Sequence, residues 1–532
     1  MQDSSQVGSF VRQAAILAFA SITVRLMGFL YRVPLTHLIG DAGNAYYIAA
    51  YRIYTIAVVA ISGSMIAALS RLTSERIAKG EYRNAHELFK TAMGFACVLG
   101  LITAVSMYVF SGFLANVVNL PGAQLSIQAL APAAFFVSIL AVIRGYFQGM
   151  KTAKPTAVSQ VIEQIVKITV SVVLAFLLLD AVYIWYSAAG AAAGTSASVL
   201  AAVIVVFVIY KKKRKEIICK VVLDVSVYKE SRSEQVKSLV KTAAPVVVGF
   251  SFFAIAGLVD LTMAGNLLTA SGEFSHYEIR LLIGQFEGKF ILLTSLPISL
   301  SMALSAAVLP EIASSQTEDD NVTVKEKADM ALRLSMALAF PSAVGISILA
   351  YPILALLFPS HPDGGVMLMV GGASIVFMSV VHVSTGVLQG IGKIRLPLVG
   401  ATIALLVKIA VNFVLMPIPE INILGAVIST IVYAVIAGGI NLYFVYKHTG
   451  SLPALNSVFV KPFIASIGMA IVCFTLPLLL GLFLPQAYVT VITLAVGLVV
   501  YLALMVAIKG FYAHDLVALP IPSKIKKLLI SS

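Results

Sequence analysis

The chain has 532 residues, of which 60% are hydrophobic and only 11% are charged. Ordinary globular proteins contain about 45–50% apolar and about 25% charged residues. With a mean hydropathy of +0.98, the chain has too few polar side chains to cover a water-soluble body, which predicts a membrane protein with many crossings. Its three cysteines lie far apart in the sequence and predict neither a disulfide framework nor a metal or redox motif.

A helix that spans a bilayer needs about 20 mainly apolar residues, and fourteen windows of this kind follow one another along the chain. They cover residues 14–39, 45–70, 88–111, 124–149, 156–179, 182–210, 241–268, 281–309, 330–350, 365–391, 396–416, 421–446, 461–482 and 487–509. The first window meets Arg25 and Arg32 in place of a cleavage site, which predicts a membrane helix and not a removable signal peptide. The expected fold is an all-α integral membrane protein with fourteen transmembrane helices.

Most Lys and Arg residues lie in one set of alternate loops or near the two ends, whereas the opposite loops contain Arg280 as their only basic residue. By the positive-inside rule, both termini are expected in the cytoplasm. The net charge of +13 follows mostly from this bias, so nucleic acid is not an expected partner. The five consecutive basic residues 211–215 either rest on anionic membrane lipids or simply stop the sixth helix in the membrane, and the two roles are compatible.

The sequence repeats itself after about 240 residues. Residues 145–167 contain Gly-Tyr-Phe-Gln-Gly, Lys-Pro and Lys, and residues 386–408 contain Gly-Val-Leu-Gln-Gly, Arg, Pro and Lys at similar spacings. Each copy holds six windows, so the two copies share one orientation, as in transporters with two parallel lobes around a central site. The predicted parts are an N-lobe at 1–210, a basic cytoplasmic linker at 211–240, a C-lobe at 241–446, and helices 13 and 14 with a cytoplasmic tail at 447–532.

Sequence motifs for catalysis are missing. Residues 284–289 are one residue short of a GxxxxGK[ST] phosphate loop, and no HExxH motif or paired Cys/His ligand set occurs. The sequence therefore predicts a secondary transporter and not an enzyme, with no cofactor and no bound ATP to drive it.

Ten charged residues fall inside the predicted spans, where each costs roughly 2.5–3.5 kcal/mol at a helix centre. They are Arg25, Arg32, Arg52, Arg144, Glu163, Lys167, Asp260, Glu287, Lys289 and Lys408. Because basic residues outnumber acidic ones, they predict a cationic aqueous cavity that selects an anion. Arginine forks fit phosphate or pyrophosphate in particular, whereas a carrier of cationic drugs would need the opposite charge.

The first helix carries the clearest part of this cavity. Arg25 and Arg32 are two turns apart on one helix face, and Gly28 between them leaves room for a bulky group. The residues themselves predict Arg25, Arg32 and Arg52 as pyrophosphate ligands.

Two carboxylates lie at a depth similar to that of Arg32 and Arg52, roughly 10–13 Å below the outer edge of the membrane. These are Asp260 and Glu287. We expect them to pair with these arginines as an outer gate, or to take part in ion coupling.

The repeat-equivalent lysines Lys167 and Lys408 are expected near the midplane of the membrane. Glu163 precedes Lys167 by one helical turn, which predicts an ion pair. That pair either holds helices together or lines the cavity. Arg144 lies near a cytoplasmic helix end and is expected to snorkel to the interface.

Three segments carry a family resemblance: Arg25-Leu-Met-Gly-Phe-Leu-Tyr-Arg32 followed by residues 38–40, residues 145–155, and the Leu-Pro pairs at 296–297 and 309–310. Over the whole chain, the sequence resembles the MurJ-type lipid II flippases of the MOP (MATE-like) exporter superfamily. Its nearest branch is the SpoVB/YtgP-like polysaccharide biosynthesis proteins of Gram-positive bacteria.

The resemblance implies a protein of the bacterial plasma membrane that moves an undecaprenyl-pyrophosphate-linked sugar from the inner to the outer leaflet by alternating access. It implies a monomer that associates with the cell-wall synthesis machinery, with coupling to a monovalent cation or to the membrane potential. By residue matching, Arg25 corresponds to the first arginine of the family's helix-1 motif and Arg52 to its helix-2 basic residue. Arg32 falls one residue later than the second arginine of the Gram-negative branch, where Tyr31 aligns. Lys289 stands in for a helix-8 arginine, and the resemblance thus implies Lys289 as a fourth pyrophosphate ligand.

Three functions stay open at this point. The first is a flippase for lipid II, the peptidoglycan precursor. The second is a flippase for another undecaprenyl-linked polysaccharide, such as a capsule, teichoic-type or spore cortex precursor. The third is an ion-coupled multidrug antiporter.

Overall fold

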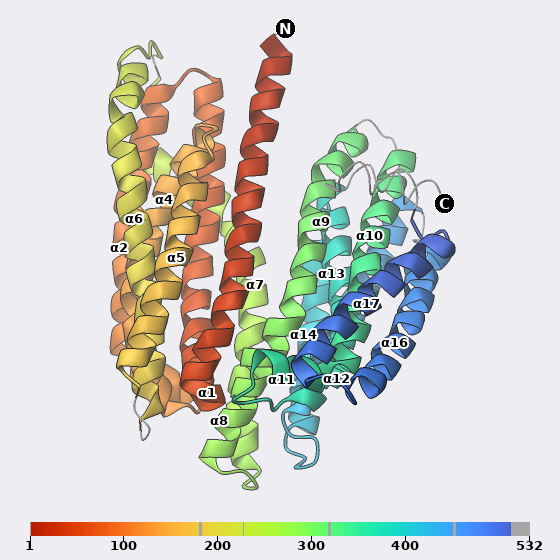
Figure 1. Cartoon of the computed structure of the whole chain (residues 1–532). Coiled ribbons are helices and arrows are strands. Elements are labelled where there is room, and N and C mark those ends of the chain that lie inside the picture. The colour runs from red at the N-terminus through yellow and green to blue at the C-terminus, as the bar shows by residue number, and fades with distance from the viewer. Residues whose placement is uncertain (1, 180–182, 227, 318–320, 451–453, 512–532) are drawn as a thin grey trace. The chain divides into compact units, whose positions relative to one another are not determined.

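Helices make up all the regular structure in the computed structural model, which describes residues 2–179, 183–226, 228–317, 321–450 and 454–511 (Figure 1). An apolar chain in lipid requires this, because a helix satisfies its backbone N–H and C=O groups internally. The predicted all-α membrane fold class is thus confirmed. The chain divides into two compact units, with residues 1–269 and 274–284 in unit 1 and residues 270–273 and 285–532 in unit 2.

Unit 1 is built around its first helix. Its elements are α1 (Gln2–Ala78), α2 (Tyr82–Val109), α3 (Ser111–Val117), the 3₁₀ turn η1 (Pro121–Ala123), α4 (Gln124–Gly149), α5 (Lys154–Leu177), α6 (Ile184–Val222), α7 (Arg232–Ala270) and α8 (His276–Gln285). Helix α1 packs against α4, α5 and α6, and α2 packs against α4. In Figure 1 these helices run nearly parallel to one another.

Helix α1 contains two predicted spans, 14–39 and 45–70, joined by a bend. Gly40 at the bend has φ 62° and ψ −176°, a left-handed φ that glycine adopts without a steric penalty. The bend brings the two arms of α1 together, so that residues 16 positions apart in the sequence touch, as Tyr31 and Tyr47 do.

Small residues let the helices of unit 1 approach closely, as in other membrane bundles. The hydroxyl of Ser171 on α5 donates to the carbonyl of Ala191 on α6 at 2.8 Å, and that of Ser187 donates to the carbonyl of Ala175 at 2.6 Å. A Cβ atom at Gly149 of α4 would lie 2.5 Å from Cβ of Thr73 on α1. These contacts fix α4, α5 and α6 around α1.

The segment between α6 and α7 is tied to the end of α1 and the start of α2. The Arg76 guanidinium pairs with Glu230 at 2.6 Å, and the Asn84 amide donates to the carbonyl of Tyr228 at 2.9 Å. The backbone N–H of Arg83 donates to Asp224 and lowers the pKa of that carboxyl. The basic run 211–215, expected in a linker, instead continues the helix of α6.

Unit 2 holds the remaining helices. They are the π-helical turn η2 (Phe286–Phe290), α9 (Ile291–Thr317), α10 (Asn321–Ile348), α11 (Ala350–Leu357), α12 (Gly365–Gly371), α13 (Ala373–Gly390), α14 (Leu396–Leu415), α15 (Leu424–Thr449), the π-helical turn η3 (Asn456–Val460), α16 (Lys461–Leu480) and α17 (Gln486–Ala507). Its core lies where α9, α10, α13 and α15 meet, with Met336, Ile375 and Leu388 among the fully buried side chains.

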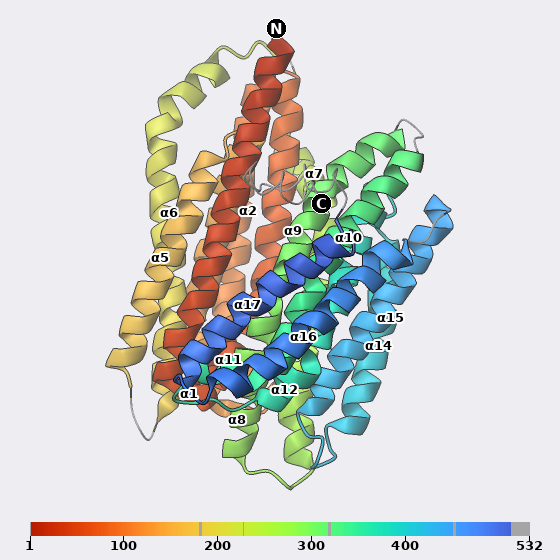
Figure 2. The ribbon, with the colours of Figure 1, turned by 45° about the vertical axis from the view of Figure 1, so that its right-hand side comes forward.

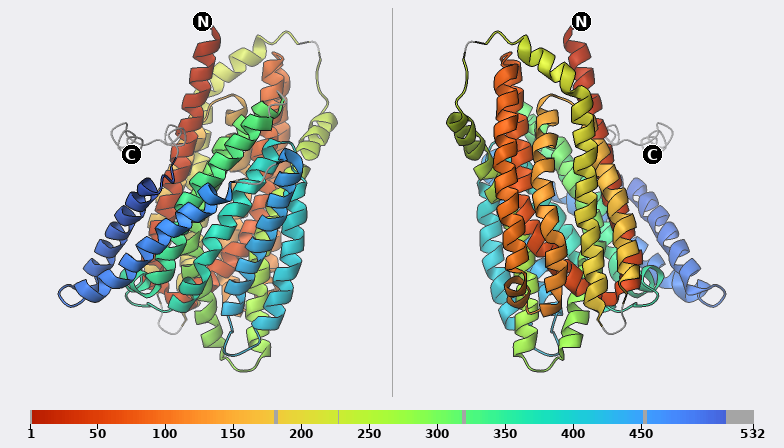
Figure 3. Two further views of the ribbon diagram at one scale, coloured as in Figure 1. Left: turned by 90° about the vertical axis from the view of Figure 1, so that its right-hand side faces the viewer. Right: turned by 90° about the vertical axis from the view of Figure 1, so that its left-hand side faces the viewer.

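Helices α16 and α17 form a hairpin at the side of unit 2 (Figures 2 and 3). Helix α16 packs against α10, and the hydroxyl of Tyr501 on α17 donates to the carbonyl of Ala337 on α10 at 2.8 Å. The outer sides of both helices expose large apolar side chains such as Phe474 and Val499, as expected where a helix faces lipid.

Each of the fourteen predicted windows falls on helix in the described residues. Twelve helices there are long and apolar enough to span a membrane, with both arms of α1 counted as one, and α7 contains a shorter apolar stretch at Ala254–Ala270. Window 365–391 covers two helices, α12 and α13, which meet at Gly372. The chain is a multi-pass membrane protein. The cytoplasmic position of its termini and the lobe boundaries at 210, 240 and 446 stay predictions, and by its contacts α7 falls within unit 1.

Candidate binding site

A pair of stacked tyrosines on the second arm of α1 holds two of the predicted cations in unit 1. The rings of Tyr47 and Tyr51 stack with centroids 6.0 Å apart. The guanidinium of Arg32 lies 5.5 Å from the Tyr47 centroid, and the ammonium of Lys167, on α5, lies 4.5 Å from that of Tyr51. Both distances fit cation–π contacts. The structure thus brings Arg32 and Lys167 together on one aromatic platform.

The bend at Gly40 is what allows this arrangement. Tyr31, next to Arg32 on the first arm, donates its hydroxyl to that of Tyr47 on the second arm at 3.3 Å, and both side chains are buried. Arg32 therefore has a fixed neighbour on the opposite arm. The Arg32 side chain is half-buried.

Arg25 and Gly28 extend the same face of α1 along its first arm. A Cβ atom at Gly28 would lie 3.3 Å from Nε2 of Gln164 on α5, so the backbone of α1 approaches α5 closely there. Arg25 lies exposed one turn before this contact. The face that contains Arg25, Gly28 and Arg32 thus passes the part of α5 that carries Glu163, Gln164 and Lys167.

Arg52 lies against α7. A Cβ atom at Gly257 would lie 2.5 Å from Nη1 of Arg52 and 2.9 Å from its Cζ, so the guanidinium occupies the space that this glycine leaves open. Asp260, buried on α7, follows Gly257 by less than one turn. The structure therefore places Arg52 beside the turn of α7 that carries one of the two predicted gate carboxylates.

The predicted Glu163–Lys167 pair is wrong, and so is the expected snorkelling of Arg144. Arg144 on α4 is buried, donates to Glu163 at 2.8 Å and to the Ser159 hydroxyl at 2.9 Å. Lys167 lies over Tyr51 instead. A buried guanidinium needs an anionic partner, and Glu163 on the neighbouring helix supplies it, so this carboxylate pairs with Arg144 and not with Lys167.

We expect the Arg144–Glu163 pair to stabilise unit 1. Breaking a fully buried pair costs about 3–5 kcal/mol, and because the Glu163 side chain is 27% exposed we expect about 1–3 kcal/mol for Arg144→Met. The midpoint of thermal aggregation in detergent should fall, and adding Glu163→Gln should restore part of it. The control Arg71→Met breaks an exposed pair with Glu75 and should change little. Equal midpoints for both variants would contradict this reading.

The remaining predicted residues lie in unit 2. Lys289 in η2 is fully buried and donates to the backbone carbonyls of His361 and Asp363 at 2.7 and 3.1 Å, while Glu287 two residues before it is also buried. In this conformation the Lys289 ammonium holds the loop before α12. Its predicted role in pyrophosphate binding stays a prediction.

Lys408 on α14 is buried, donates to the hydroxyl of Thr430 at 3.1 Å, and lies 5.7 Å from the ring centroid of Tyr433. Its repeat equivalent, Lys167, also lies over a tyrosine ring. The two copies of the repeat thus share a side-chain contact as well as a sequence pattern. Each unit contains a lysine near the middle of a helix that lies over a tyrosine ring.

The aromatic platform itself was not predicted from the sequence. Tyr47, Tyr51 and Tyr54 follow one another at helical spacing, a signal that can be read from the sequence as one face of a helix. The contact of Arg280 with the Tyr46 hydroxyl at 2.7 Å was not predicted either. The sequence offers no signal for it, because the two residues are 234 positions apart.

Comparison with known proteins connects this arrangement to a family. Residues 10–316 match the family described as polysaccharide biosynthesis protein, and residues 290–414 match the MatE family. The chain belongs to the polysaccharide biosynthesis protein family. This confirms the resemblance to the MurJ-type branch of the MOP superfamily.

Two relatives from Bacillus subtilis (strain 168) match nearly the full length. The protein named lipid II flippase MurJ is 24% identical over 522 residues, which cover 92% of this chain and 94% of that protein. Stage V sporulation protein B is 24% identical over 470 residues, which cover 87% of this chain and 88% of that protein.

Solved structures show the same fold. The structure of lipid II flippase MurJ in an inward closed conformation has a TM-score of 0.69 at 17% identity, covering 94% of this chain and all of that chain. An inward-facing multidrug resistance MATE family transporter of the MOP superfamily has a TM-score of 0.66 at 16% identity, covering 81% of this chain and 98% of that chain. The MurJ relative and both structures are flippases or transporters by name, and the structures show that this chain has their fold.

Proposed function

We propose that this protein is a flippase that moves an undecaprenyl-pyrophosphate-linked saccharide between the membrane leaflets, and that lipid II is its substrate. The observation that carries the proposal is the cationic face in unit 1, where Arg32 and Lys167 share an aromatic platform next to the helix face of Arg25. Guanidinium groups bind phosphate oxygens through charge-assisted hydrogen bonds. The name of the MurJ relative supports lipid II as the cargo.

Charge separates this function from drug export. The face formed by Arg25, Arg32 and Lys167 attracts an anion and repels the cationic compounds that a multidrug antiporter would carry. The likeness to MATE transporters concerns the fold alone. A flippase for a different undecaprenyl-linked saccharide is the second candidate, because a sporulation protein matches the chain over nearly the same length.

Depletion of the protein separates these candidates. If lipid II is the substrate, depleted cells should accumulate lipid II in the inner leaflet and lose wall integrity. An intact wall with loss of a spore or surface polysaccharide would assign the second candidate. Drug sensitivity as the only change would contradict both flippase assignments.

The proposal extends to the location of the protein, its oligomeric state and its energy source. We infer a monomer in the bacterial plasma membrane with both ends in the cytoplasm, next to the cell-wall synthesis machinery. Transport needs no cofactor and is driven by a monovalent cation gradient or by the membrane potential, which is worth about 2.3 kcal/mol per charge per 100 mV. Flipping in proteoliposomes should therefore respond to an imposed potential or to a cation gradient, and a rate indifferent to both would contradict the coupling.

A further inference from the structure

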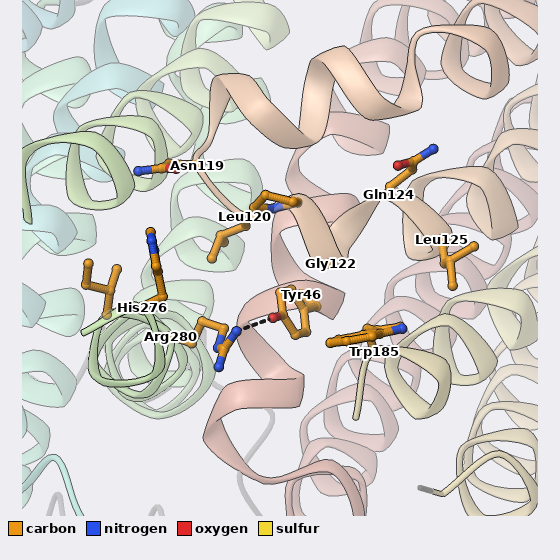
Figure 4. Close-up of a pocket in the computed structure, with 11 residues that line it drawn as sticks. Tyr46, Asn119, Leu120, Gly122, Gln124, Leu125, Trp185, His276 and Arg280 are labelled. Atoms are coloured by element: carbon orange, nitrogen blue, oxygen red, sulfur yellow. Dashed lines mark hydrogen bonds between the residues drawn. The ribbon is translucent and has the colours of Figure 1, made fainter. Parts of the chain in front are cut away.

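Unit 1 contains a cavity of about 570 Å³, and Arg25, Arg32 and Lys167 are not among the residues that line it. It lies at the start of α6, the end opposite the basic run 211–215, and thus on the predicted outer side. The polar residues that line it are Tyr46, Asn119, Gln124, Trp185, His276 and Arg280 (Figure 4). They come from α1, the segment between α3 and α4, the start of α4, the start of α6, and α8.

Arg280 gives the cavity a positive charge with hydrogen-bonding capacity left over. Its Nη1 donates to the Tyr46 hydroxyl at 2.7 Å, and its guanidinium lies 5.6 Å from the ring centroids of Tyr46 and Tyr277. The Arg280 side chain is half-buried, and a guanidinium has five N–H donors. The accessible donors that Tyr46 does not use can bond an anionic ligand in the cavity.

Two walls of the cavity are aromatic. Figure 4 shows Trp185 beside Tyr46, with Arg280 on the other side of Tyr46. A Cβ atom at Gly122 would lie 2.6 Å from Cζ of Tyr46, so the backbone before α4 rests directly on the tyrosine ring. The Trp185 ring contacts that of Tyr183 at 4.9 Å between centroids. The aromatic walls are therefore formed before any ligand enters.

Amide and imidazole groups complete the lining. The Asn119 amide is anchored by donating to the Gly265 carbonyl at 3.1 Å and to the Thr269 hydroxyl at 2.6 Å. Gln124 lies above Trp185, and His276 lies one helical turn before Arg280 on α8 (Figure 4). Such groups can hydrogen-bond the hydroxyl and acetamido groups of a sugar.

We propose that this cavity binds a saccharide that bears a carboxylate. The aromatic rings would cover the apolar face of a sugar ring, the amides and His276 would contact its polar groups, and Arg280 would take the carboxylate. Its volume lies within the usual 300–1,000 Å³ of small-molecule sites. The choice of a lipid-linked saccharide as the source of this group rests on the proposed function. A sugar with a free carboxylate fits its second candidate, because the muramic acid carboxyl of lipid II forms the amide bond to the peptide. A lipid phosphate would bind Arg280 alone and leave the two aromatic walls without a partner, so it is the alternative that the titration tests.

Trp185 is the chain's only tryptophan, so intrinsic tryptophan fluorescence reports on this cavity alone. The purified full-length protein in detergent should be titrated with N-acetylmuramic acid, with the neutral N-acetylglucosamine, and with glycerol 1-phosphate. We expect a saturable change with N-acetylmuramic acid, at a half-saturating concentration at least tenfold below those of the other two probes. Arg280→Gln should remove this preference, while Arg395→Gln, an exposed arginine of unit 2, should keep it.

Each other outcome overturns the proposal. Absence of a saturable change would show that the cavity binds no such sugar, and equal responses to N-acetylmuramic acid and glycerol 1-phosphate would make it a phosphate site. A preference that survives Arg280→Gln in folded protein, checked by size-exclusion chromatography, would remove Arg280 from the site. Binding is measured without flipping, so a protein that binds the acidic sugar but moves no lipid-linked saccharide would refute the proposed function and leave this inference standing.

Discussion

Replacing Arg25, Arg32 or Arg52 singly by alanine is expected to lower flipping by at least tenfold while the protein still folds and inserts. A hydrogen bond to a charged group contributes about 1.5–3 kcal/mol, and each 1.4 kcal/mol corresponds to a tenfold change. Loss of one guanidinium should therefore lower activity by roughly 10- to 100-fold. Arg25→Lys should also be impaired, because an ammonium cannot replace the two-pronged contact of a guanidinium with phosphate.

The measurement is complementation of cells depleted of the protein, together with flipping of a labelled lipid in proteoliposomes. Amounts of each variant in the membrane must match those of the wild type. Arg71→Ala serves as the control, because this arginine forms an exposed pair with Glu75 on the last turns of α1. If two of the three alanine variants flip at the wild-type rate, the pyrophosphate site does not lie on this face of α1.

The helices and the charges could be predicted from the sequence, because both depend on local properties. An apolar window of sufficient length has to be helical in lipid, and a charge inside such a window stands out whatever its partner. The repeat also predicted that Lys167 and Lys408 are equivalent, and both indeed lie over tyrosine rings.

The partners of those charges could not be predicted. The spacing of four residues predicts Lys167 as the partner of Glu163. In the structure, Arg144 on a neighbouring helix pairs with Glu163, and Lys167 lies over the ring of Tyr51. Such choices depend on which helices touch and how closely, and these distances are set by glycines such as Gly28. Glycine is common in membrane helices, so a glycine in an apolar window does not by itself predict a close helix contact. The contact can be identified only when the position of the second helix is known.

Gly257→Val is expected to impair flipping nearly as strongly as Arg52→Ala, without removing any charge. The new side chain would occupy the space where Nη1 of Arg52 now lies, 2.5 Å from the position of Cβ. Because the displaced atoms are the far end of a flexible side chain, the guanidinium can move and α1 and α7 can keep their positions. Glycine is about 1 kcal/mol less favourable than alanine inside a helix, so the substitution should not weaken the fold through helix propensity.

We expect at least a tenfold loss of flipping for Gly257→Val, about 1.4 kcal/mol, with an unchanged thermal midpoint in detergent. The matched control is Gly94→Val on α2, where the added Cβ would meet only its own helix backbone within 4 Å among the described residues. This variant should flip normally. Combining Gly257→Val with Arg52→Ala should give little further loss, because both changes remove the same guanidinium from the same place. Wild-type flipping by Gly257→Val next to an inactive Arg52→Ala would show that Arg52 acts from a position other than the one it occupies against α7.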